Sequence, residues 1–294
     1  MSTDLALVEL IRRALQEDLG GVGDITTQAT VPVDAVGTAY VVARQQGVLS
    51  GSRCVDTAFD LVDPQLQVEW SAKDGAEVAP GQVVATVRGS ACSILTGERV
   101  GLNLLSHLSG IATRTAGLVR LLDGTGARIA DTRKTTPGLR ALQKQAVRNG
   151  GGINHRFGLF DAILVKDNHI GLGGGLTQVL RRLAEHAGHL TRVEIEVDDL
   201  DQLRQVLAFD AARLRSGHAP VVHAVLLDNM GPDLIAEGAA LIRDHPAPVT
   251  VEVSGGVTEE SVRALAQAGA DVISVGALTH SVTELDFGLD LHES

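Results

Sequence analysis

The chain has 294 residues, of which 44% are hydrophobic and 2% aromatic, and its net charge is −11. At about 150 residues per domain this length predicts two domains, and the composition excludes a disordered chain. The negative charge makes nucleic acid an unfavourable partner. The sequence has no run of about 18 apolar residues that could span a membrane. Its two cysteines, Cys54 and Cys92, do not form a disulfide framework, so we expect a cytoplasmic protein.

The N-terminal third predicts helices and antiparallel strands. Leu5, Val8, Ile11 and Leu15 recur at helical spacing, and Gly20 and Gly21 end that helix. Short Val-rich segments separated by Gly and Pro predict strands at 37–43, 66–72 and 82–88. A helical pattern then covers 92–122, with a break expected at Gly110. We therefore expect a first domain at residues 1–110 and a second at 111–280.

Beyond residue 110 the sequence alternates between strands and helices. Six apolar segments end at Ala130, Val165, Val197, Leu227, Val253 and Val275, with amphipathic helical segments between them. This alternation predicts a parallel sheet, and both a doubly wound sheet and a barrel fit it. Polar residues directly follow nearly every strand, where (β/α) barrels place their active sites. With only six strands, we expect an α/β domain built as an incomplete, open barrel.

Basic residues are concentrated between Asp131 and Lys166. This segment carries seven Lys or Arg and two Asp, a local charge of +5 that an anionic ligand would relieve. Four cations adjoin strand ends or the Gly-rich loop before His155, and they predict a site for a small polyanionic acid: Arg133, Lys134, Arg156 and Lys166. The other three, spaced every four residues, predict a solvated helix face: Arg140, Lys144 and Arg148. His155 itself could be structural or functional.

A second anion site is predicted after the last two strands. Ser254, Gly255 and Gly256 precede a helix whose expected N-cap is Thr258, and Gly276 follows the final strand. Backbone N–H groups in such turns bind phosphate. The acids Glu196 and Asp228 lie at neighbouring strand ends. They are either salt-bridge partners of the cations, or they hold Mg²⁺ or stabilise positive charge on a sugar.

Several segments together resemble one family, the quinolinate phosphoribosyltransferases. They are EDLGGVGDITT at 17–27, ERVGLNLLSHLSGIAT at 98–113, DTRKTTPGLRALQKQAVRNGGGINHR at 131–156, KDNH at 166–169, VEIEVDDLDQL at 193–203 and SVGALTHS at 274–281. The resemblance covers nearly the whole chain, and the stretch at 131–156 is its most specific part.

The resemblance implies a reaction, a fold and an assembly. Quinolinate and phosphoribosyl pyrophosphate would give nicotinate mononucleotide, carbon dioxide and pyrophosphate in NAD synthesis, with Mg²⁺ as the cofactor. An N-terminal α/β sandwich, rejoined by residues 281–294, would be joined to the open α/β barrel. The protein would be a homodimer with shared active sites, with further assembly left open.

The resemblance also implies roles for individual residues. Lys134, Glu196 and Asp228 would act in catalysis, Lys134 between the two substrates and the two acids facing the ribose and the metal. The 5′-phosphate would bind Ser254, Gly255, Gly256 and Gly276, assisted by His280. Quinolinate would bind Arg133, His155, Arg156 and Lys166, with Arg99 supplied by the partner subunit.

Two alternatives remain open at the level of sequence. A related phosphoribosyltransferase-like protein of molybdenum metabolism shares the barrel, although the intact DTRKTTPGLR and NHR motifs favour the quinolinate enzyme. Residues 73–87 have the Gly turns of a biotinyl or lipoyl carrier module, yet no Lys stands in the expected hairpin, so we interpret them as a strand pair. The segment between Glu196 and Asp228 is longer than the resemblance leads us to expect and predicts a lengthened helix or loop.

Overall fold

The computed structural model describes residues 2–292, and the chain divides into two compact units. The first unit contains the residues up to Ala116, Thr135–Gly151 and the residues from Leu278 onward. The second contains Gly117–Lys134 and Gly152–Ala277. Residues 135–151, which a division at residue 110 assigns to the second domain, therefore belong by their contacts to the first unit.

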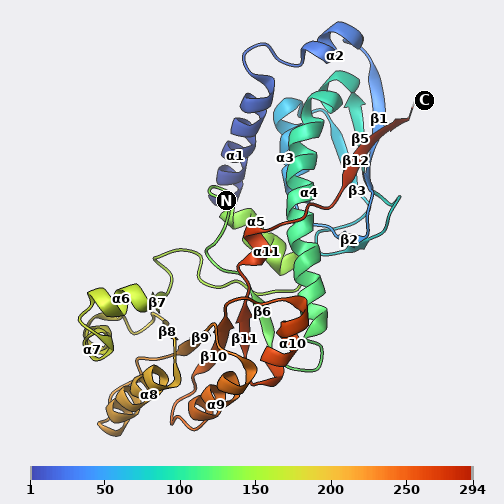
Figure 1. Cartoon of the computed structure of the whole chain (residues 1–294). Helices are drawn as coiled ribbons and strands as arrows, with labels where there is room; N and C mark the ends of the chain where they lie inside the picture. Colours follow the sequence, from blue (N-terminus) through green and yellow to red (C-terminus); the bar gives the residue numbers. More distant parts are fainter. Residues whose placement is uncertain (1, 293–294) are drawn as a thin grey trace. The chain divides into compact units, whose positions relative to one another are not determined.

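The first unit is a sandwich of helices on an antiparallel sheet of strand order β12-β1-β5-β3 (Figure 1). A short pair, β2 with β4, lies outside this sheet. Its helices and strands are α1 (Ser2–Leu19), α2 (Ile25–Thr30), β1 (Val36–Ala43), β2 (Gly47–Val48), α3 (Ser52–Val62), β3 (Gln67–Trp70), β4 (Glu77–Val78), β5 (Val83–Ser90), α5 (Arg140–Asn149), α11 (Ala277–His280), β12 (Phe287–His292) and the larger part of α4 (Ala91–Leu121).

The core of this unit joins one face of the sheet to α3 and α4. Alternate residues of β1, among them Ala39 and Val41, are fully buried and belong to one hydrophobic cluster with Phe59 of α3 and Leu105 of α4. In α1 the buried stripe contains Leu7 and not Leu5, which is exposed. The predicted strands at 37–43, 66–72 and 82–88 correspond to β1, β3 and β5. The expected α/β sandwich is confirmed.

The helix α4 is continuous, so the break expected at Gly110 is wrong. Gly110 is buried inside the helix, and a Cβ atom there would lie 2.2 Å from the main-chain oxygen of Thr283. The glycine therefore allows the chain at residue 283 to pass close to the helix instead of ending it. This explains why glycine occurs in an otherwise apolar helical pattern.

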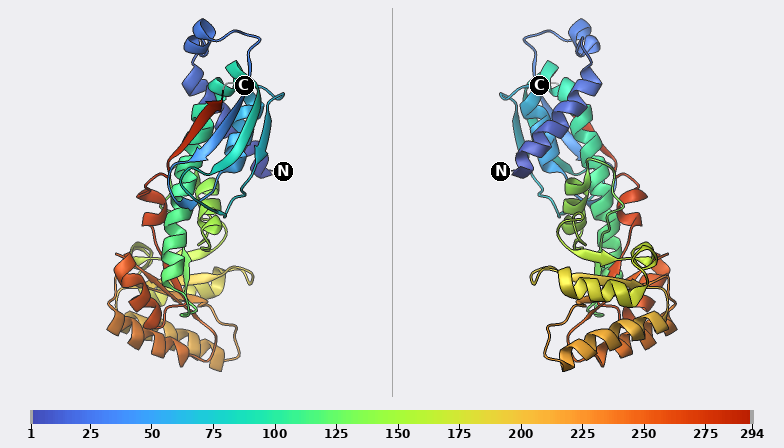
Figure 2. Two further views of the ribbon diagram at one scale, coloured as in Figure 1. Left: turned by 90° about the vertical axis from the view of Figure 1, so that its right-hand side faces the viewer. Right: turned by 90° about the vertical axis from the view of Figure 1, so that its left-hand side faces the viewer.

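The C-terminal strand completes the N-terminal sheet. β12 pairs antiparallel with β1 over the whole range from Thr38 opposite His292 to Ala43 opposite Phe287. Figure 2 shows this strand, in dark red, beside the blue strand β1. The strand pair predicted at 73–87 is wrong: its strands β4 and β5 belong to the first unit but do not pair with each other, because β4 pairs with β2 and β5 pairs with β1 and β3.

The second unit is an all-parallel six-stranded sheet of order β6-β11-β10-β9-β8-β7 with helices between the strands (Figure 1). The strands do not close into a barrel within the described part of the chain, which confirms the expected open architecture. The elements are β6 (Arg128–Ala130), β7 (Ile163–Val165), α6 (Asp167–Leu172), α7 (Leu176–His186), β8 (Val193–Val197), α8 (Leu200–Arg215), β9 (Ala224–Asp228), α9 (Pro232–Arg243), β10 (Thr250–Ser254), α10 (Glu259–Gln267) and β11 (Val272–Ser274).

Alternation along these strands separates an apolar face from a polar one. All five residues of β8 are buried, yet every second one is a glutamate. Since side chains alternate between the two faces of a strand, Glu194 and Glu196 share one face while Val193, Ile195 and Val197 share the other. The register brings Glu252 of β10 to the same face as Glu194 and Glu196. The inner face of the open barrel is therefore lined with carboxyl groups.

The long segment between Glu196 and Asp228 forms α8 and the loop that leads to β9. Asp210, fully buried in α8, accepts hydrogen bonds from the backbone N–H groups of Val221 at 2.6 Å and Val222 at 3.3 Å. This carboxylate anchors the loop before β9 starts. Among the described residues, no helix is both long enough and apolar enough to cross a membrane.

Candidate active site

Four predicted residues meet at the carboxyl ends of neighbouring strands. Lys166 directly follows β7, Glu196 is the penultimate residue of β8, and Asp228 and Ser254 end β9 and β10. Asp228 and Ser254 are register partners, and Glu196 is paired with Leu226, two residues before Asp228. The parallel register thus places these side chains on one face at one end of the sheet.

Lys166 and Glu196 form a salt bridge between the Nζ and Oε2 atoms. The carboxylate is nearly buried, whereas the lysine side chain is 43% exposed. Asp228 differs, because its Oδ2 accepts a hydrogen bond at 2.6 Å from the Asn229 side chain, and within the described residues no cation forms a salt bridge with it. Of the two acids, only Glu196 has the cationic partner that one sequence interpretation proposed for both.

The predicted phosphate loop depends on a glycine packed against Asn229. Gly255 has φ +97°, and a Cβ atom there would lie 2.0 Å from Oδ1 of Asn229 and 3.0 Å from its Cα. Asn229 itself has φ +53°, a conformation that asparagine tolerates better than most residues. Its N–H donates to the carbonyl of Ser254 at 2.9 Å. Thr258 caps α10, as predicted, by accepting from the N–H of Ser261.

The loop that carries the NHR motif is held by Asp131. This residue follows β6, is fully buried, and accepts hydrogen bonds from the Asn154 side chain at 2.6 Å and from the N–H of His155 at 2.9 Å. Ile153 also forms a parallel bridge with Ala130. Because of these contacts, the loop at residues 153–155 is held beside the end of β6.

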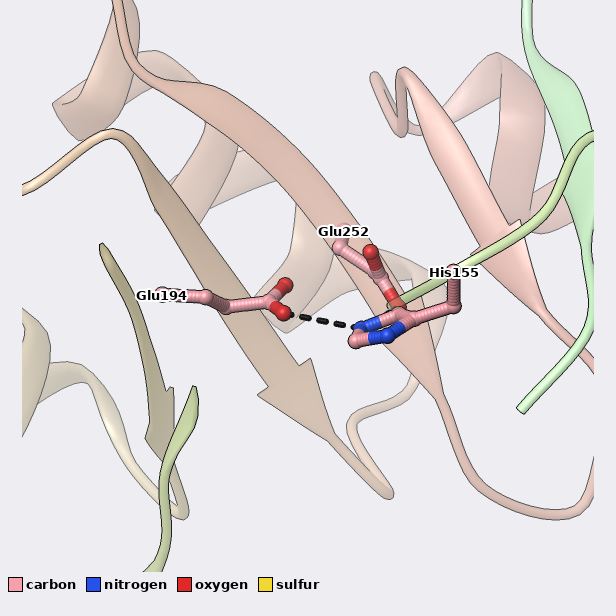
Figure 3. Close-up of side chains that lie close together, drawn as sticks. All are labelled: His155, Glu194 and Glu252. Atoms are coloured by element: carbon pink, nitrogen blue, oxygen red, sulfur yellow. Dashed lines mark hydrogen bonds and ion pairs between the residues drawn. The ribbon is translucent and has the colours of Figure 1, made fainter. Parts of the chain in front are cut away.

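His155 projects into the barrel interior, between two glutamates (Figure 3). Its Nε2 lies 2.9 Å from Oε2 of Glu194 and 3.6 Å from Oε1 of Glu252. Burial raises the pKa of Glu252 to about 8, and the negative charge of Glu194 adds to this effect. The cluster therefore carries less negative charge at neutral pH than two free carboxylates would.

Two arginines stand close together beside this cluster. Burial lowers the pKa of Arg156, and the positive charge of Arg133 lowers it further, whereas Asp161 and Glu194 act in the opposite direction. An Nη1 atom of Arg156 donates to the carbonyl of Ala162 at 3.1 Å. Its Nε is buried and has no hydrogen-bond partner among the residues that the structure describes. The pair is thus suited to a ligand with more than one negative charge.

A cavity of about 320 Å³ adjoins these groups. Its lining includes His155, Arg156, Glu194 and Glu252, together with the first residues of four strands: Ile163, Val193, Ala224 and Thr250. Glu194 precedes Glu196 by two residues, or about 6.6 Å along the strand. The His155 cluster and the Lys166–Glu196 pair therefore occupy successive levels of one inner face.

Four predicted residues remain: Lys134, Gly276, Arg99 and His280. Lys134 is exposed in the loop after β6, where its N–H donates to Oγ1 of Thr132, and Gly276 follows β11. Arg99 and His280 belong to the first unit: Arg99 is exposed on α4 beside Glu98, and Nδ1 of His280 lies 2.8 Å from Oγ of Ser281. Of the predicted quinolinate-binding residues, the structure brings His155 and Arg156 to one cavity, with Arg133 acting on the pKa of Arg156, whereas Lys166 pairs with Glu196.

The prediction that the three cations of α5 form a solvated face is wrong for the middle one, Lys144. Lys144 is only 2% exposed, because it belongs to the buried face of the helix with Gln143, Ala146 and Val147. Arg140 donates from Nε to Thr135 at 3.0 Å, and Arg148 contacts Gln145 on the exposed side. All three cations belong to the first unit, whereas Arg133 and Arg156 belong to the second.

Sequence reasoning missed three residues of the site, namely Glu194, Glu252 and Asn229. The period-two glutamates of VEIEV and the single glutamate of VEVS were available signals, since a charge repeated within an apolar strand indicates a polar inner face. For Asn229, the signal was an Asn directly after a strand-terminal Asp.

The fold and these side chains define an enzyme domain of the parallel α/β class, with polar groups such as Lys166, Glu196 and Asp228 at the carboxyl ends of the strands. Two family models match the chain, the quinolinate phosphoribosyl transferase N-terminal domain at residues 24–109 and the C-terminal domain at 111–290. The chain belongs to the quinolinate phosphoribosyltransferase family.

Individual relatives agree with this assignment. The chain is 46% identical over 289 residues to the nicotinate-nucleotide pyrophosphorylase (carboxylating) of Mycobacterium leprae, covering 96% of each chain. It is 39% identical over 297 residues to the chloroplastic enzyme of that name from Arabidopsis thaliana, covering 97% of this chain and 82% of the relative. Its structure is similar to that of the Francisella tularensis nicotinate-nucleotide pyrophosphorylase, with a TM-score of 0.86, 36% identity, and coverage of 98% and 96%.

Proposed function

We propose that the protein transfers the phosphoribosyl group of phosphoribosyl pyrophosphate to quinolinate and releases carbon dioxide, giving nicotinate mononucleotide and pyrophosphate for NAD synthesis. The observation that carries this proposal is the Arg133–Arg156 pair, two guanidinium groups whose positive charges act on one another in a protein of net charge −11. Quinolinate has two adjacent carboxylates, and guanidinium groups bind carboxylates through paired hydrogen bonds. Lys166 adds a third cation at the next strand end.

The chemistry requires charge of both signs. The ring nitrogen of quinolinate forms a bond to C1 of the ribose while pyrophosphate leaves with the bonding electrons. Positive charge develops on the sugar, and the carboxylates of Glu196 and Asp228 would stabilise it. The ring nitrogen then carries a positive charge, so the electrons left at C2 by departing carbon dioxide are stabilised until a proton replaces them. Lys134 would stand between the two substrates.

The phosphate of the ribose would bind at the carboxyl ends of β10 and β11. Gly255 and Gly256 expose backbone N–H groups, and at Gly256 a Cβ would meet nothing within 4 Å. Ser254 adds a hydroxyl group and Gly276 a second turn without a side chain. His280 would assist from the first unit.

We further propose Mg²⁺ as the cofactor. Mg²⁺ prefers oxygen ligands and is commonly held by one or two carboxylates together with substrate phosphates and water. Glu196 and Asp228 fit this requirement, since they lie on one face at the ends of neighbouring strands. The bound ion would neutralise charge on the pyrophosphate.

The proposed assembly is a cytoplasmic homodimer in which Arg99 of one subunit contacts quinolinate in the other. Arg99 supports this proposal because its side chain is 62% exposed on α4, where it forms a 3.3 Å salt bridge with the neighbouring Glu98. The free thiols of Cys54 and Cys92 are consistent with a reducing compartment.

The test combines an assay with one substitution. The purified protein, supplied with quinolinate, phosphoribosyl pyrophosphate and Mg²⁺, should release carbon dioxide in step with nicotinate mononucleotide. Arg133→Ala should weaken quinolinate binding by about 2–5 kcal/mol, because a buried charge partner is lost, as measured by calorimetry.

The matched control is Arg181→Ala, which removes an exposed arginine of α7 in the same unit and should change nothing. Failure of the wild-type protein to release carbon dioxide would contradict the proposed reaction. Equal quinolinate affinities for wild type and Arg133→Ala would exclude Arg133 from the site.

A further inference from the structure

A chain of hydrogen bonds lies behind Arg156. The backbone N–H of Arg156 donates to Nδ1 of His155 at 2.7 Å. Because Nδ1 is the acceptor in this contact, the ring proton of a neutral imidazole resides on Nε2. That nitrogen points to Oε2 of Glu194 at 2.9 Å, as the dashed line in Figure 3 shows. Both ring nitrogens are therefore used inside the protein.

Glu252 is the second carboxyl group beside the His155 ring. Only 6% of Glu252 and 8% of Glu194 is exposed, and a carboxyl oxygen of each lies within 3.6 Å of Nε2 of His155 (Figure 3). Oε1 of each glutamate is buried without a hydrogen-bond partner among the described residues. Burial raises the pKa of Glu252 to about 8, and the negative charge of Glu194 adds to this rise.

The same negative charge acts on Arg156. Glu194 favours the charged form of this arginine, opposing both burial and the repulsion from Arg133. The guanidinium is held at one end by the carbonyl of Ala162, while its Nε atom remains unpartnered. Glu194 thus acts on Arg156 in two ways: through hydrogen bonds by way of the His155 ring, and through direct charge–charge attraction.

We propose that Glu194 and Glu252 are positioning residues for quinolinate: Glu194 orients the His155 ring, the ring fixes the backbone at Arg156, and Glu252 lies against the same ring nitrogen beside Glu194. This inference rests on the proposed function. It assigns to His155 a supporting role, in which the imidazole acts on quinolinate through Arg156.

A metal ion is the competing occupant of this cluster. One ligand atom each from His155, Glu194 and Glu252 lies within 4.8 Å of the others, a spacing that suits a divalent cation. A metal at Nε2 would require the ring proton to move to Nδ1, where it would oppose the N–H of Arg156. The observed contact therefore favours a ring held by hydrogen bonds, and the test must distinguish the two.

The first experiment compares Glu194→Met with Glu194→Gln. Glutamine keeps an oxygen that accepts the Nε2 proton, whereas methionine has a similar size and lacks the acceptor. Glu194→Met should raise the KM for quinolinate about tenfold or more, the effect of losing a hydrogen bond to a charged group. The KM for phosphoribosyl pyrophosphate and the kcat should stay near the wild-type values. Glu194→Gln should restore most of the quinolinate affinity.

The control is Val251→Ala, which shortens a buried side chain on the opposite face of β10. This variant should lower the thermal midpoint and leave the KM for quinolinate unchanged. If Glu194→Met changed all kinetic parameters together with stability, or if Gln failed to rescue, the positioning role would be wrong. An inactive wild-type protein would instead refute the proposed function, so the two failures are distinguishable.

The second experiment needs no enzymatic activity. In ¹⁵N-labelled wild-type protein, NMR should show His155 as the neutral tautomer protonated on Nε2, with its signals assigned by their loss in His155→Gln. Glu252→Gln should preserve this tautomer. A ring protonated on Nδ1, or loss of the Nε2 proton on adding one equivalent of Zn²⁺, would overturn the proposal, and the second result would identify a metal site.

Discussion

The pKa of the Glu252 carboxyl group is set by its surroundings in the folded protein. Burial, followed by the charge of Glu194, raises its pKa from 4.5 to about 8. The folded protein therefore binds this proton more tightly than the unfolded chain does. The resulting stabilisation is fully present below pH 4.5 and is lost as the pH rises through 8, at about 1.4 kcal/mol for each unit of pKa difference.

We therefore predict that Glu252→Gln flattens the pH dependence of stability. The free energy of unfolding of the wild-type protein should fall between pH 5 and pH 9 relative to that of the variant, because glutamine has no proton to lose. Denaturant unfolding at pH 5, 7 and 9 measures this difference. Parallel curves for the two proteins would show that Glu252 is ionised in the fold at neutral pH.

Sequence patterns explain part of this site and not the rest. The alternation in VEIEV is sufficient to place Glu194 and Glu196 on one face of a strand. It does not indicate that the side chain of His155, 39 positions before Glu194, contacts Glu194 on that face. That contact depends on Asp131 holding the loop beside β6, and a buried carboxylate with two specific donors leaves no periodic signal in the sequence.

At the scale of elements, two glycines of helix α4 differ in what surrounds them. Gly110 lies against the backbone of Thr283, whereas a Cβ at Gly117 would meet nothing within 4 Å. Both residues look alike in the sequence, as single glycines in an amphipathic pattern. Only the partner segment, which lies more than 170 positions away in the chain, distinguishes them. A helix break was therefore the natural prediction, and tertiary packing overrode it.

This difference predicts opposite effects of the same substitution. Gly110→Ala should destabilise the protein by about 1–3 kcal/mol, because the added methyl group must displace backbone. Gly117→Ala should stabilise it by roughly 0.5–1 kcal/mol, since alanine loses less conformational entropy in a helix. Thermal and denaturant unfolding of the two variants provide the measurement. A stable Gly110→Ala protein would mean that residue 283 does not pack on α4.

At the scale of the whole molecule, the strand–helix alternation predicted the second sheet well. Each predicted strand end lies within one residue of the observed one, because parallel strands buried on both sides give continuous apolar segments. The unit to which α5 belongs could not be predicted, since an amphipathic pattern shows that a helix has a buried face and not what covers it. Its Lys144 was misassigned for the same reason.

The shared active site proposed for the dimer predicts complementation. Arg99→Ala and Lys166→Ala should each be inactive alone. After subunit exchange, a mixed dimer contains one site with both residues intact, so an equal mixture should regain about a quarter of the wild-type activity in a symmetric assembly. Activity of the mixture against that of each variant is the measurement. No recovery after proven exchange would place Arg99 in the same chain as the site it serves.

The pairing of β12 with β1 has a consequence for synthesis on the ribosome. Residues 36–43 emerge long before residues 287–292, the strand that covers their outer edge. Until then this edge of the nascent sheet is open to pairing with other chains. A premature stop before residue 287 would leave that edge exposed permanently, so we expect such a truncated chain to aggregate.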